Sequence, residues 1–290
     1  MSKRTLIISV FHQYNENIQF FIENGLFQSE DKTFLLVLNG LMTDREHCDF
    51  LELYSNVHVL IRPNEGYDFA GVNSALFTPF SMLSKRIFNE KDFSKEDEDY
   101  LYLHFDQFVV LNASVKGPYL PLYVQENWVD LFTSPLSEEV KLSGISANLL
   151  ASSPNDMITF HLSRKYPEYH FPDRVHIQSM AYCFDRESLD LFFKYDIFSK
   201  GKQYPSDKDE LIACYEVGMS LILRLEKKNL FSLDISQGEI DWNSTEYDGD
   251  IWWSREDHPI LETIFVKTNT PKSQFPEKIR YDHSPYYKIE

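Results

Sequence analysis

The segment Phe108-Val109-Val110-Leu111-Asn112-Ala113-Ser114 decides the fold that the sequence predicts. Its four consecutive apolar residues are typical of a strand that is buried on both faces of a parallel sheet. Two polar side chains, Asn112 and Ser114, follow at the carboxyl end, and Gly117-Pro118 then interrupts the chain. Open α/β sheets bind ligands at the carboxyl ends of their strands. The segment therefore predicts a central strand that ends at a ligand site.

Three similar apolar runs precede this strand, at residues 5–10, 34–38 and 57–61. A segment with helical spacing, 15–26, lies between the first two runs, and a polar helical segment, 44–54, lies between the second and the third. Strands that alternate with helices are typical of a doubly wound sheet. We predict an α/β fold with a Rossmann-like, mostly parallel central sheet flanked by helices.

The second half of the chain has less regular patterns. It predicts a helix at 120–132, a strand at 141–147, a long binding loop at 152–174, a strand at 176–184, a helix at 185–193, an amphipathic helix from Ser206 to Asn229 and a strand at 263–267. The length of 290 residues and the 43% hydrophobic composition provide ample core for one large domain.

Composition and charge exclude some classes of function. A net charge of −17 argues against a general nucleic-acid binder, because phosphate backbones are bound mainly by clustered Lys and Arg. A single diphosphate can still be held by a metal ion, a Lys or a helix amino terminus. The 15% aromatic residues either form an aromatic-rich core or include rings that bind sugars or bases.

Cysteine usage and hydropathy bear on the compartment. Cys48, Cys183 and Cys214 form no CxxC pair and are odd in number, which favours a reducing environment. Residues 1–10 contain too short an apolar run for a signal peptide, and no stretch of the chain is long enough for a membrane span. We expect a soluble, cytoplasmic protein without a membrane span.

Several well-known motifs are missing from the sequence. There is no GxxxxGK[ST], no GxGxxG after the first predicted strand, no GxSxG and no HExxH. P-loop proteins, dinucleotide-binding proteins and hydrolases of those types are therefore minor alternatives.

Four segments resemble, in this order, a group of glycosyltransferases with the GT-A fold. They are PNEGYDFAGVNSAL (63–76), FVVLNASVKGPYLP (108–121), YEVGMSLIL (215–223) and HPILETIFVKTN (258–269). The group includes capsule-type enzymes and enzymes of large DNA viruses, among them xylosyltransferases of chloroviruses. The resemblance implies one GT-A-like domain over 1–290, in which 1–120 form the nucleotide-sugar-binding half and 121–290 form the acceptor-binding half, with a small acceptor-side subregion.

The resemblance implies an enzyme that transfers a sugar, such as xylose, from a nucleotide-diphosphate donor such as a UDP-sugar. The acceptor would be an oligosaccharide or a glycoprotein glycan, the reaction would be inverting, and a viral enzyme would act in the host cytoplasm. One alternative is a catalytically inactive glycan- or nucleotide-binding protein that keeps the same sheet. Another is a nucleotidyltransferase, although the basic Gly-rich loop expected after its first strand is missing.

Asn112 and Ser114 occupy the position at which the resembling enzymes carry a metal-binding DxD motif. Mn²⁺ or Mg²⁺ prefers oxygen ligands, and neutral amide and hydroxyl oxygens bind these cations more weakly than carboxylates do. The cation would then be held mainly by the diphosphate and water, or Lys116 or Lys267 would neutralise the leaving group. Alternatively, Asn112 and Ser114 only stabilise a turn.

The resemblance also suggests which residues contact the nucleotide sugar. Most of them lie near the ends of predicted strands, and one is a lysine of the carboxy-terminal segment. The candidates are Phe11, His12, Asn39, Asn64, Gly66, Asp68 and Lys267. Each of the charged or titratable residues has a structural alternative. His12 would be a structural hydrogen-bonding group, Asp68 a helix cap and Lys267 an exposed surface cation.

An inverting transfer needs a carboxylate that accepts the proton of the acceptor hydroxyl. Glu216 is the first candidate, because it lies on the amphipathic helix whose counterpart borders the acceptor site in the resembling enzymes; Asp106 and Asp209 are the next candidates. Glu216 is four residues from Ser220, so both should share one helix face. Alternatively, Glu216 is structural or orients the acceptor.

His176, Trp252 and Trp253 are candidates for contacts with the acceptor. His170 and His176, with Arg174 between them, are candidates for contacts with the diphosphate or the acceptor. The alternatives are that the loop residues are solvated and that the two tryptophans seal the sheet.

Overall fold

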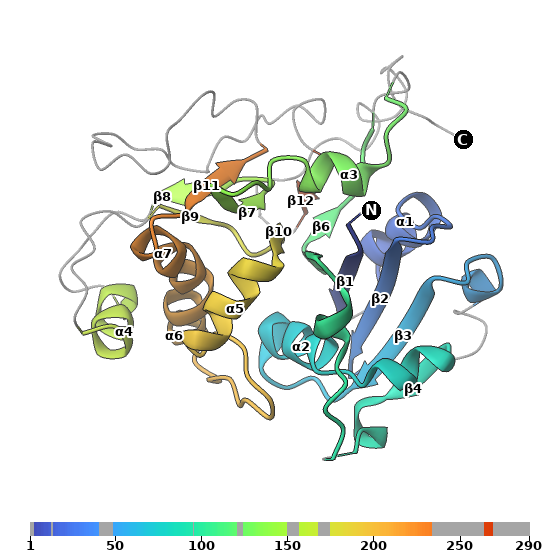
Figure 1. Ribbon diagram of the computed structural model, residues 1–290, viewed down its shortest axis with the longest axis horizontal. Coiled ribbons are helices and arrows are strands. Elements are labelled where there is room, and N and C mark those ends of the chain that lie inside the picture. Colours follow the sequence, from blue (N-terminus) through green and yellow to red (C-terminus); the bar gives the residue numbers. More distant parts are fainter. Residues whose placement is uncertain are drawn as a thin grey trace.

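The computed structural model describes residues 3–12, 14–40, 49–94, 96–120, 124–149, 157–167, 175–233 and 264–268. A sheet of eight strands runs through the described molecule (Figure 1). Across the sheet, the strands are β11 (Asn229–Ser232), β7 (Val140–Gly144), β10 (Ala181–Asp185), β5 (Gln107–Asn112), β1 (Thr5–Phe11), β2 (Lys32–Asn39), β3 (Val57–Arg62) and β4 (Ile87–Asn89). Only β10 runs antiparallel to its neighbours, so the predicted α/β fold with a mostly parallel sheet is confirmed.

Two small sheets add to the large one within the described residues. One pairs β6 (Val115–Lys116) with β12 (Val266–Lys267), and the other pairs β8 (Ala147–Leu149) with β9 (Val175–Ile177). Both follow strands of the large sheet in the chain, β5 and β7. The two small sheets therefore lie beyond the carboxyl ends of β5 and β7.

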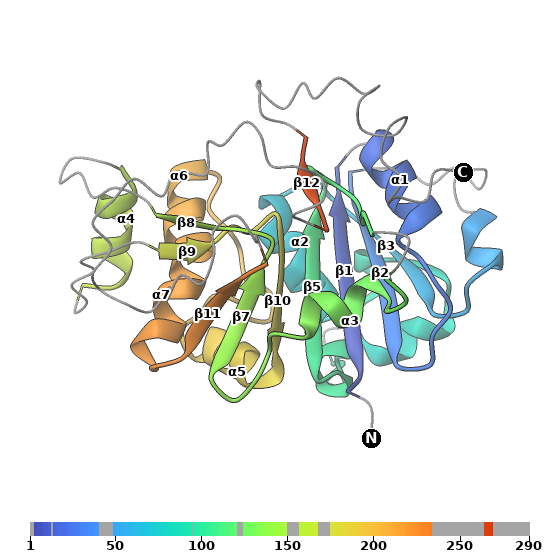
Figure 2. The ribbon, with the colours of Figure 1, turned by 90° about the horizontal axis from the view of Figure 1, so that it is seen from above.

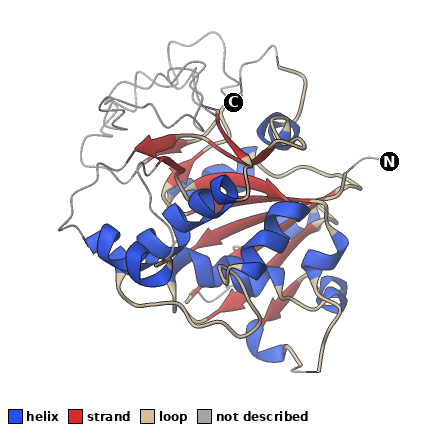
Figure 3. Cartoon of the chain, turned by 60° about the vertical axis from the view of Figure 1, so that its left-hand side comes forward, coloured by secondary structure: helices blue, strands red, loops and turns tan. Residues whose placement is uncertain are grey.

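Helices flank the large sheet or pack against other helices beside it (Figures 2 and 3). They are α1 (Glu16–Asn24), α2 (Tyr67–Leu76), α3 (Trp128–Thr133), α4 (Met157–Lys165), α5 (Arg186–Lys194), α6 (Lys208–Leu211) and α7 (Gly218–Leu225), with a π-helical segment, Ile212–Val217, between the last two. Short 3₁₀ turns cover Asp49–Glu52, Phe80–Ser84, Glu90–Asp92 and Leu101–His104.

Side chains of β1 alternate between two apolar cores, as the strand pleat requires. Leu6, Ile8 and Val10 belong to the core that includes residues of α2, α5 and α7. Ile7 and Phe11 belong to the core that includes residues of α1 and α3. Because both faces of β1 are covered, its sequence is apolar throughout rather than alternating.

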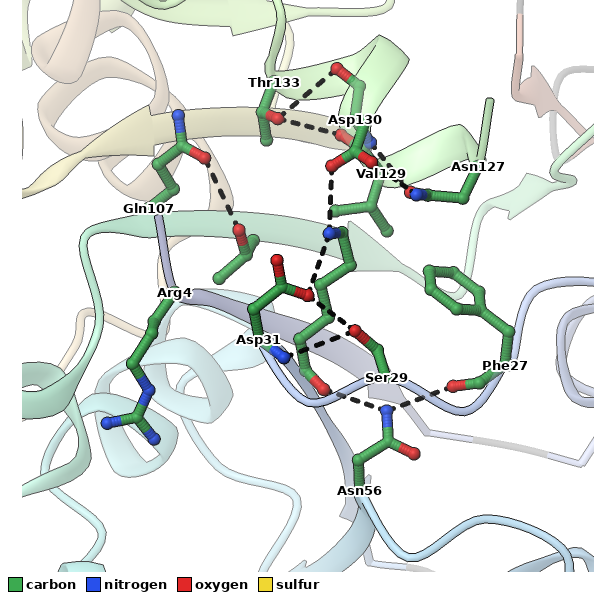
Figure 4. A network of polar contacts seen from close by, with 12 residues as sticks. Arg4, Phe27, Ser29, Asp31, Asn56, Gln107, Asn127, Val129, Asp130 and Thr133 are labelled. Carbon is green, nitrogen blue, oxygen red and sulfur yellow. Dashed lines mark hydrogen bonds and ion pairs between the residues drawn. The ribbon is translucent and has the colours of Figure 1, made fainter. Parts of the chain in front are cut away.

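Polar contacts link the amino ends of the strands to neighbouring segments (Figure 4). Lys32 Nζ lies 3.1 Å from Asp31 Oδ1 and 3.0 Å from Asp130 Oδ1, so β2 is tied to the first turn of α3. Asn56 Nδ2 donates to the carbonyl oxygens of Phe27 (3.0 Å) and Lys32 (2.9 Å). This edge of the sheet is thus engaged in holding the fold together.

Several predicted elements differ from the observed ones. Residues 176–184 form two strands, β9 and β10, separated by a turn, and residues 141–147 are likewise divided between β7 and β8. The helix predicted at 120–132 begins only at Trp128, where Asn127 Oδ1 caps it by accepting from the Asp130 N–H (3.0 Å). The loop predicted at 152–174 contains α4.

Other boundaries differ near residues 44–54 and 206–229. Of the helix predicted at 44–54, residues 49–52 form a 3₁₀ turn, and 41–48 lie outside the described residues. The amphipathic helix predicted from Ser206 is helical over 208–225, with the π-helical segment inside it, and is followed by β11. No helix among the described residues combines the length and apolar character needed to cross a membrane.

Candidate active site at the carboxyl edge of the sheet

The strand order reverses direction between β1 and β5. From β1, the chain adds β2, β3 and β4 on one side and β5 on the other. Val10 and Asn112 are register partners, so the ends of β1 and β5 lie side by side. Ligands of open α/β sheets bind at such a reversal, outside the carboxyl ends of the strands. His12 and Asn112 therefore flank the expected ligand position.

The segment after β5 is a tight polar turn. Asn112 Oδ1 accepts a hydrogen bond from the backbone N–H of Ser114 (2.9 Å) and another from its hydroxyl. The Ala113 carbonyl accepts from Asn17 Nδ2 (2.9 Å) of α1. Because its oxygen is used within the turn, Asn112 presents its amide N–H groups to the site. The structure thus shows the turn that was the alternative to metal binding for Asn112 and Ser114.

Asp68 lies beside this turn, in the first turn of α2. Its carboxylate is hydrogen bonded to the Asn112 side chain and experiences the charges of His12 and Glu216. Burial raises the pKa of Asp68 to about 6; His12 and Asn112 act in the opposite direction, and Glu216 raises the pKa further. Asp68 is not the helix cap that was the alternative for it, because the N-cap position is Gly66.

Glycines allow α2 to begin and to pack where it does. Gly66 has a φ of 69°, in the left-handed region that glycine adopts without strain. A Cβ on Gly71 would lie 2.7 Å from Val10 Cγ1 of β1, so α2 can approach β1 this closely only with glycine at 71. Asn39, which is 1% exposed, also holds this region, since its Oδ1 accepts from Arg62 Nη1 (2.9 Å) and its Nδ2 donates to the Tyr67 carbonyl (3.4 Å).

Glu216 faces the same site from the π-helical segment. One carboxylate oxygen lies 3.4 Å from His176 Nε2, and the other accepts a hydrogen bond from the Ser179 hydroxyl. Burial alone would raise the pKa of Glu216, but the hydrogen bonds and charge of His176, together with Ser179, outweigh it and hold the pKa below its usual range. One turn later, Ser220 Oγ accepts from the Ile177 N–H (3.0 Å). Glu216 and Ser220 thus share a helix face, as predicted, and both contact β9.

Tyr182 lies near both Asp68 and Glu216. It lies on β10, is 2% exposed and has its pKa raised by burial and by the charges of Asp68 and Glu216. The hydroxyl therefore stays protonated. Sequence reasoning identified neither Tyr182 nor Ser179, because an apolar strand pattern covers both and gives no sign of which residues face the site.

The carboxy-terminal segment brings Lys267 beside the turn. Val266 and Lys267 pair with Lys116 and Val115, and the Thr268 N–H donates to the Ser114 carbonyl (2.8 Å). Asn64, which is exposed, packs against Gly40 after β2, where a Cβ on the glycine would lie 2.9 Å from Asn64 Cβ. Both residues thus lie at or near the carboxyl edge of the sheet.

The structure places other candidates away from this site. Phe11 is 2% exposed and packs against Phe21, so its ring is enclosed in a core rather than open to a base. Asp106 precedes β5 at the opposite end of the strand from Asn112, and its Oδ2 accepts from the Arg4 N–H (2.8 Å). Asp209 is exposed in the first turn of α6.

His176 was expected to contact the acceptor. In the structure it is 1% exposed, and its Nε2 is directed at Glu216. Trp252, Trp253, His170 and Arg174 lie outside the described residues.

A divalent cation would need more carboxylates than the strand end supplies. Among the described residues, no group of three or more His, Cys, Asp or Glu side chains could hold a metal ion. Near the turn, Asp68 is an acidic oxygen donor, and Asn112 Oδ1 is already engaged by Ser114. These residues do not fit a cation held chiefly by protein carboxylates.

Neither protein-family models nor curated proteins match the chain. Solved structures similar to it include nucleotidyl- and glycosyltransferases. The 4-diphosphocytidyl-2C-methyl-D-erythritol synthase of Anaerococcus prevotii DSM 20548 is 12% identical over 79% of this chain and 86% of that chain, with a TM-score of 0.38.

A cytidylyltransferase of Leptospira borgpetersenii serovar Hardjo-bovis (strain JB197) is 9% identical over 80% of this chain and 76% of that chain, with a TM-score of 0.37. Mouse xyloside xylosyltransferase 1, in its apo form, is 12% identical over 86% of this chain and 95% of that chain, with a TM-score of 0.31. At these TM-scores, the likeness carries neither an activity nor a substrate to this chain.

Proposed function

We propose that this protein is a glycosyltransferase that moves a sugar from a nucleotide diphosphate to a hydroxyl group of a glycan. One observation carries the proposal: Asp68 lies at the strand-order reversal near enough to Glu216 to experience its charge, and the pKa values of the two carboxylates are shifted in opposite directions. A pair of carboxylates with separated pKa values is a common basis for assigning acid–base roles in an active site. The position outside the strand ends is the one at which such sheets bind nucleotides.

The donor would lie across the ends of β1 and β5. Lys267, beside the polar turn, supplies positive charge near the strand ends, and His12, directly after β1, offers a hydrogen-bonding ring there. This charge would stabilise the diphosphate as it leaves. A carboxylate accepts the proton of the acceptor hydroxyl while that oxygen attacks the anomeric carbon, and the carbon–oxygen bond to the diphosphate breaks with its electron pair on the phosphate.

The finer features of the proposal are the donor, a UDP-sugar such as UDP-xylose, and an inverting outcome. A carboxylate that acts as base on the acceptor suits an inverting displacement, because the acceptor then attacks from the face opposite the leaving group. Product stereochemistry, determined by NMR of the glycoside, checks this feature separately from activity.

Titration calorimetry with a panel of UDP-, GDP-, CDP- and TDP-sugars, with and without Mn²⁺, tests the proposal. We expect binding of at least one nucleotide sugar. Substituting Lys267→Ala should weaken that binding by roughly 10- to 100-fold, the effect of losing a charge-assisted hydrogen bond, and should leave binding of the free nucleoside unchanged. Lys91→Ala, at an exposed lysine of the 3₁₀ turn Glu90–Asp92, is the matched control.

If none of the nucleotide sugars binds, the proposal is wrong. Equal loss of nucleoside and nucleotide-sugar binding in the Lys267→Ala variant would contradict the role of Lys267 at the diphosphate.

A catalytically silent binding protein is the second candidate. The observation that favours it is the polar turn, in which Asn112 and Ser114 replace carboxylates and hydrogen bond to one another. This candidate predicts nucleotide-sugar binding without turnover on any glycan, so product analysis by mass spectrometry separates the two functions.

A further inference from the structure

The two carboxylates of the site differ in how their oxygens are occupied. Glu216 has a partner at each oxygen: His176 Nε2 at 3.4 Å from one, and the Ser179 hydroxyl on the other. Both partners belong to the segment from β9 to the start of β10, and Ser220 anchors the same segment through the Ile177 N–H. Glu216 is therefore held in place, with its oxygens directed into the protein.

Asp68 has a less restricted carboxylate. Among the described residues, it is hydrogen bonded to the Asn112 side chain, whose orientation is fixed because Ser114 occupies its oxygen. Asp68 is half-buried and lies at the strand-order reversal, where the donor sugar is expected. Within the described part of the chain, Asn112 is the hydrogen-bond partner shown for Asp68, which leaves a carboxylate oxygen able to accept the proton of an acceptor hydroxyl.

The groups that face Asp68 come from several elements. They are His12 after β1, Asn112 at the end of β5, Glu216 in the π-helical segment and Tyr182 on β10. Burial and the negative charge of Glu216 raise the pKa of Asp68 to about 6, whereas the pKa of Glu216 is lowered. A base is most effective when its pKa lies near the working pH, so Asp68 is the stronger base of the pair.

We infer that Asp68 is the catalytic base of the proposed transfer and that Glu216 is a positioning residue that remains ionised. This inference rests on the proposed function. The proton of the acceptor hydroxyl moves to an Asp68 oxygen, the acceptor oxygen forms a bond with the anomeric carbon, and the nucleoside diphosphate leaves with the electron pair of the broken bond. Burial is the main reason that Asp68 is basic, and Glu216, held by His176 and Ser179, supplies a fixed negative charge that adds to this effect.

The pH dependence of kcat/KM for glycan transfer, in the wild type and in the Asp68→Asn and Glu216→Gln variants, tests the assignment. We expect the wild type to lose activity below about pH 6, as Asp68 becomes protonated. Asp68→Asn should lower kcat by roughly 10²- to 10⁴-fold and abolish this acid limb. Its affinity for the donor should stay within about threefold of the wild type, a change of less than 1 kcal/mol.

Glu216→Gln gives the discriminating result. Because the negative charge of Glu216 raises the pKa of Asp68, its removal should move the acid limb to lower pH while reducing kcat far less than Asp68→Asn does. An acid limb that stays in place would show that the charge of Glu216 does not act on the base. Asp190→Asn, at an exposed position of α5, is the matched control for replacing a carboxylate by an amide.

The outcomes separate the inference from the proposed function. If the wild type transfers sugar, but Glu216→Gln abolishes both turnover and the acid limb while Asp68→Asn keeps them, the inference is wrong and the function stands. If the wild type turns over no nucleotide sugar on any glycan, the proposed function fails and the inference fails with it. Calorimetric donor binding by each variant shows that a loss of turnover does not come from unfolding.

Discussion

Asp68 combines a functional position with an unfavourable environment. Its folded-state pKa, about 6, lies above the ordinary value of 3.8, and burial is the largest cause. The folded protein therefore binds more protons than the unfolded chain between these two values, so stability falls as the pH rises through this window. Above it, the ionised carboxylate destabilises the fold.

Asp68→Asn should accordingly stabilise the protein at pH 7.5, by about 1–3 kcal/mol on the relation of 1.36 kcal/mol per pKa unit. The gain should vanish near pH 3, where Asp68 is protonated in both states. Urea unfolding at the two pH values measures this difference, with Asp190→Asn as the control. A variant less stable than the wild type at pH 7.5 would show that the ionised carboxylate makes stabilising contacts that outweigh its burial.

The sequence predicted the positions of candidate site residues correctly where they follow from a local pattern, such as the end of a buried strand. The predicted strand ends brought His12 and Asn112 together, because a parallel register fixes which ends are neighbours. The contact between Glu216 and His176 joins the π-helical segment to β9, which pairs with β8 in a small sheet rather than with the large sheet. No local pattern encodes this tertiary contact, so the sequence could not pair the two residues.

Packing of α2 on β1 is the feature that positions Asp68 at the element scale. Gly71 lies at the contact, with space for no Cβ beside Val10. Substituting Gly71→Ala adds a methyl group to this contact, and overpacking of this kind destabilises by about 1–3 kcal/mol, partly offset by the better helix propensity of Ala. We expect a net loss of stability.

A double-mutant cycle with Val10→Ala checks the cause. Val10→Ala alone should destabilise by leaving space beside Gly71, and the added Cβ of Gly71→Ala should fill that space in the double variant. The double variant should then lose about 1–2 kcal/mol less than the sum of the single losses, as expected for residues in contact. Strict additivity in urea unfolding would show that the two residues do not share the contact.

Prediction of the elements succeeded for long, buried strands and failed for short or interrupted elements. β1, β2, β3 and β5 have apolar runs because both faces are covered. By contrast, β4 and β11 are edge strands of three and four residues, too short to give a pattern. The turn between β9 and β10 contains neither Gly nor Pro, so the two strands looked like one.

The π-helical segment could not be predicted either. Residues 208–225 have one continuous amphipathic pattern, and a single wide turn hardly changes it. The Tyr166 hydroxyl, which donates to the Cys214 carbonyl (3.1 Å), satisfies a backbone group within the segment. Such wide turns often occur at functional sites, and here the segment carries Glu216.

At the scale of the whole molecule, the net charge of −17 gives a further prediction. Like charges repel one another in the compact state, and this repulsion is screened by salt. We expect the melting temperature to rise when NaCl increases from about 20 to 200 mM, a range over which the Debye length falls below about 10 Å. An equal osmolarity of sucrose is the uncharged control. A fall with salt would mean that attractive ion pairs, such as those of Lys32 and Lys141, outweigh the repulsion.

The antiparallel strand β10 has a consequence for synthesis on the ribosome. β5 ends at Asn112, but its partner on the far side begins only at Ala181, about 70 residues later in the chain. At 5–20 residues per second, the backbone groups on that side of β5 wait about 4–14 s for their partner. An unpaired strand edge is a template for intermolecular pairing. The nascent chain is therefore most prone to aggregate, and most in need of a chaperone, during the interval before β10 emerges.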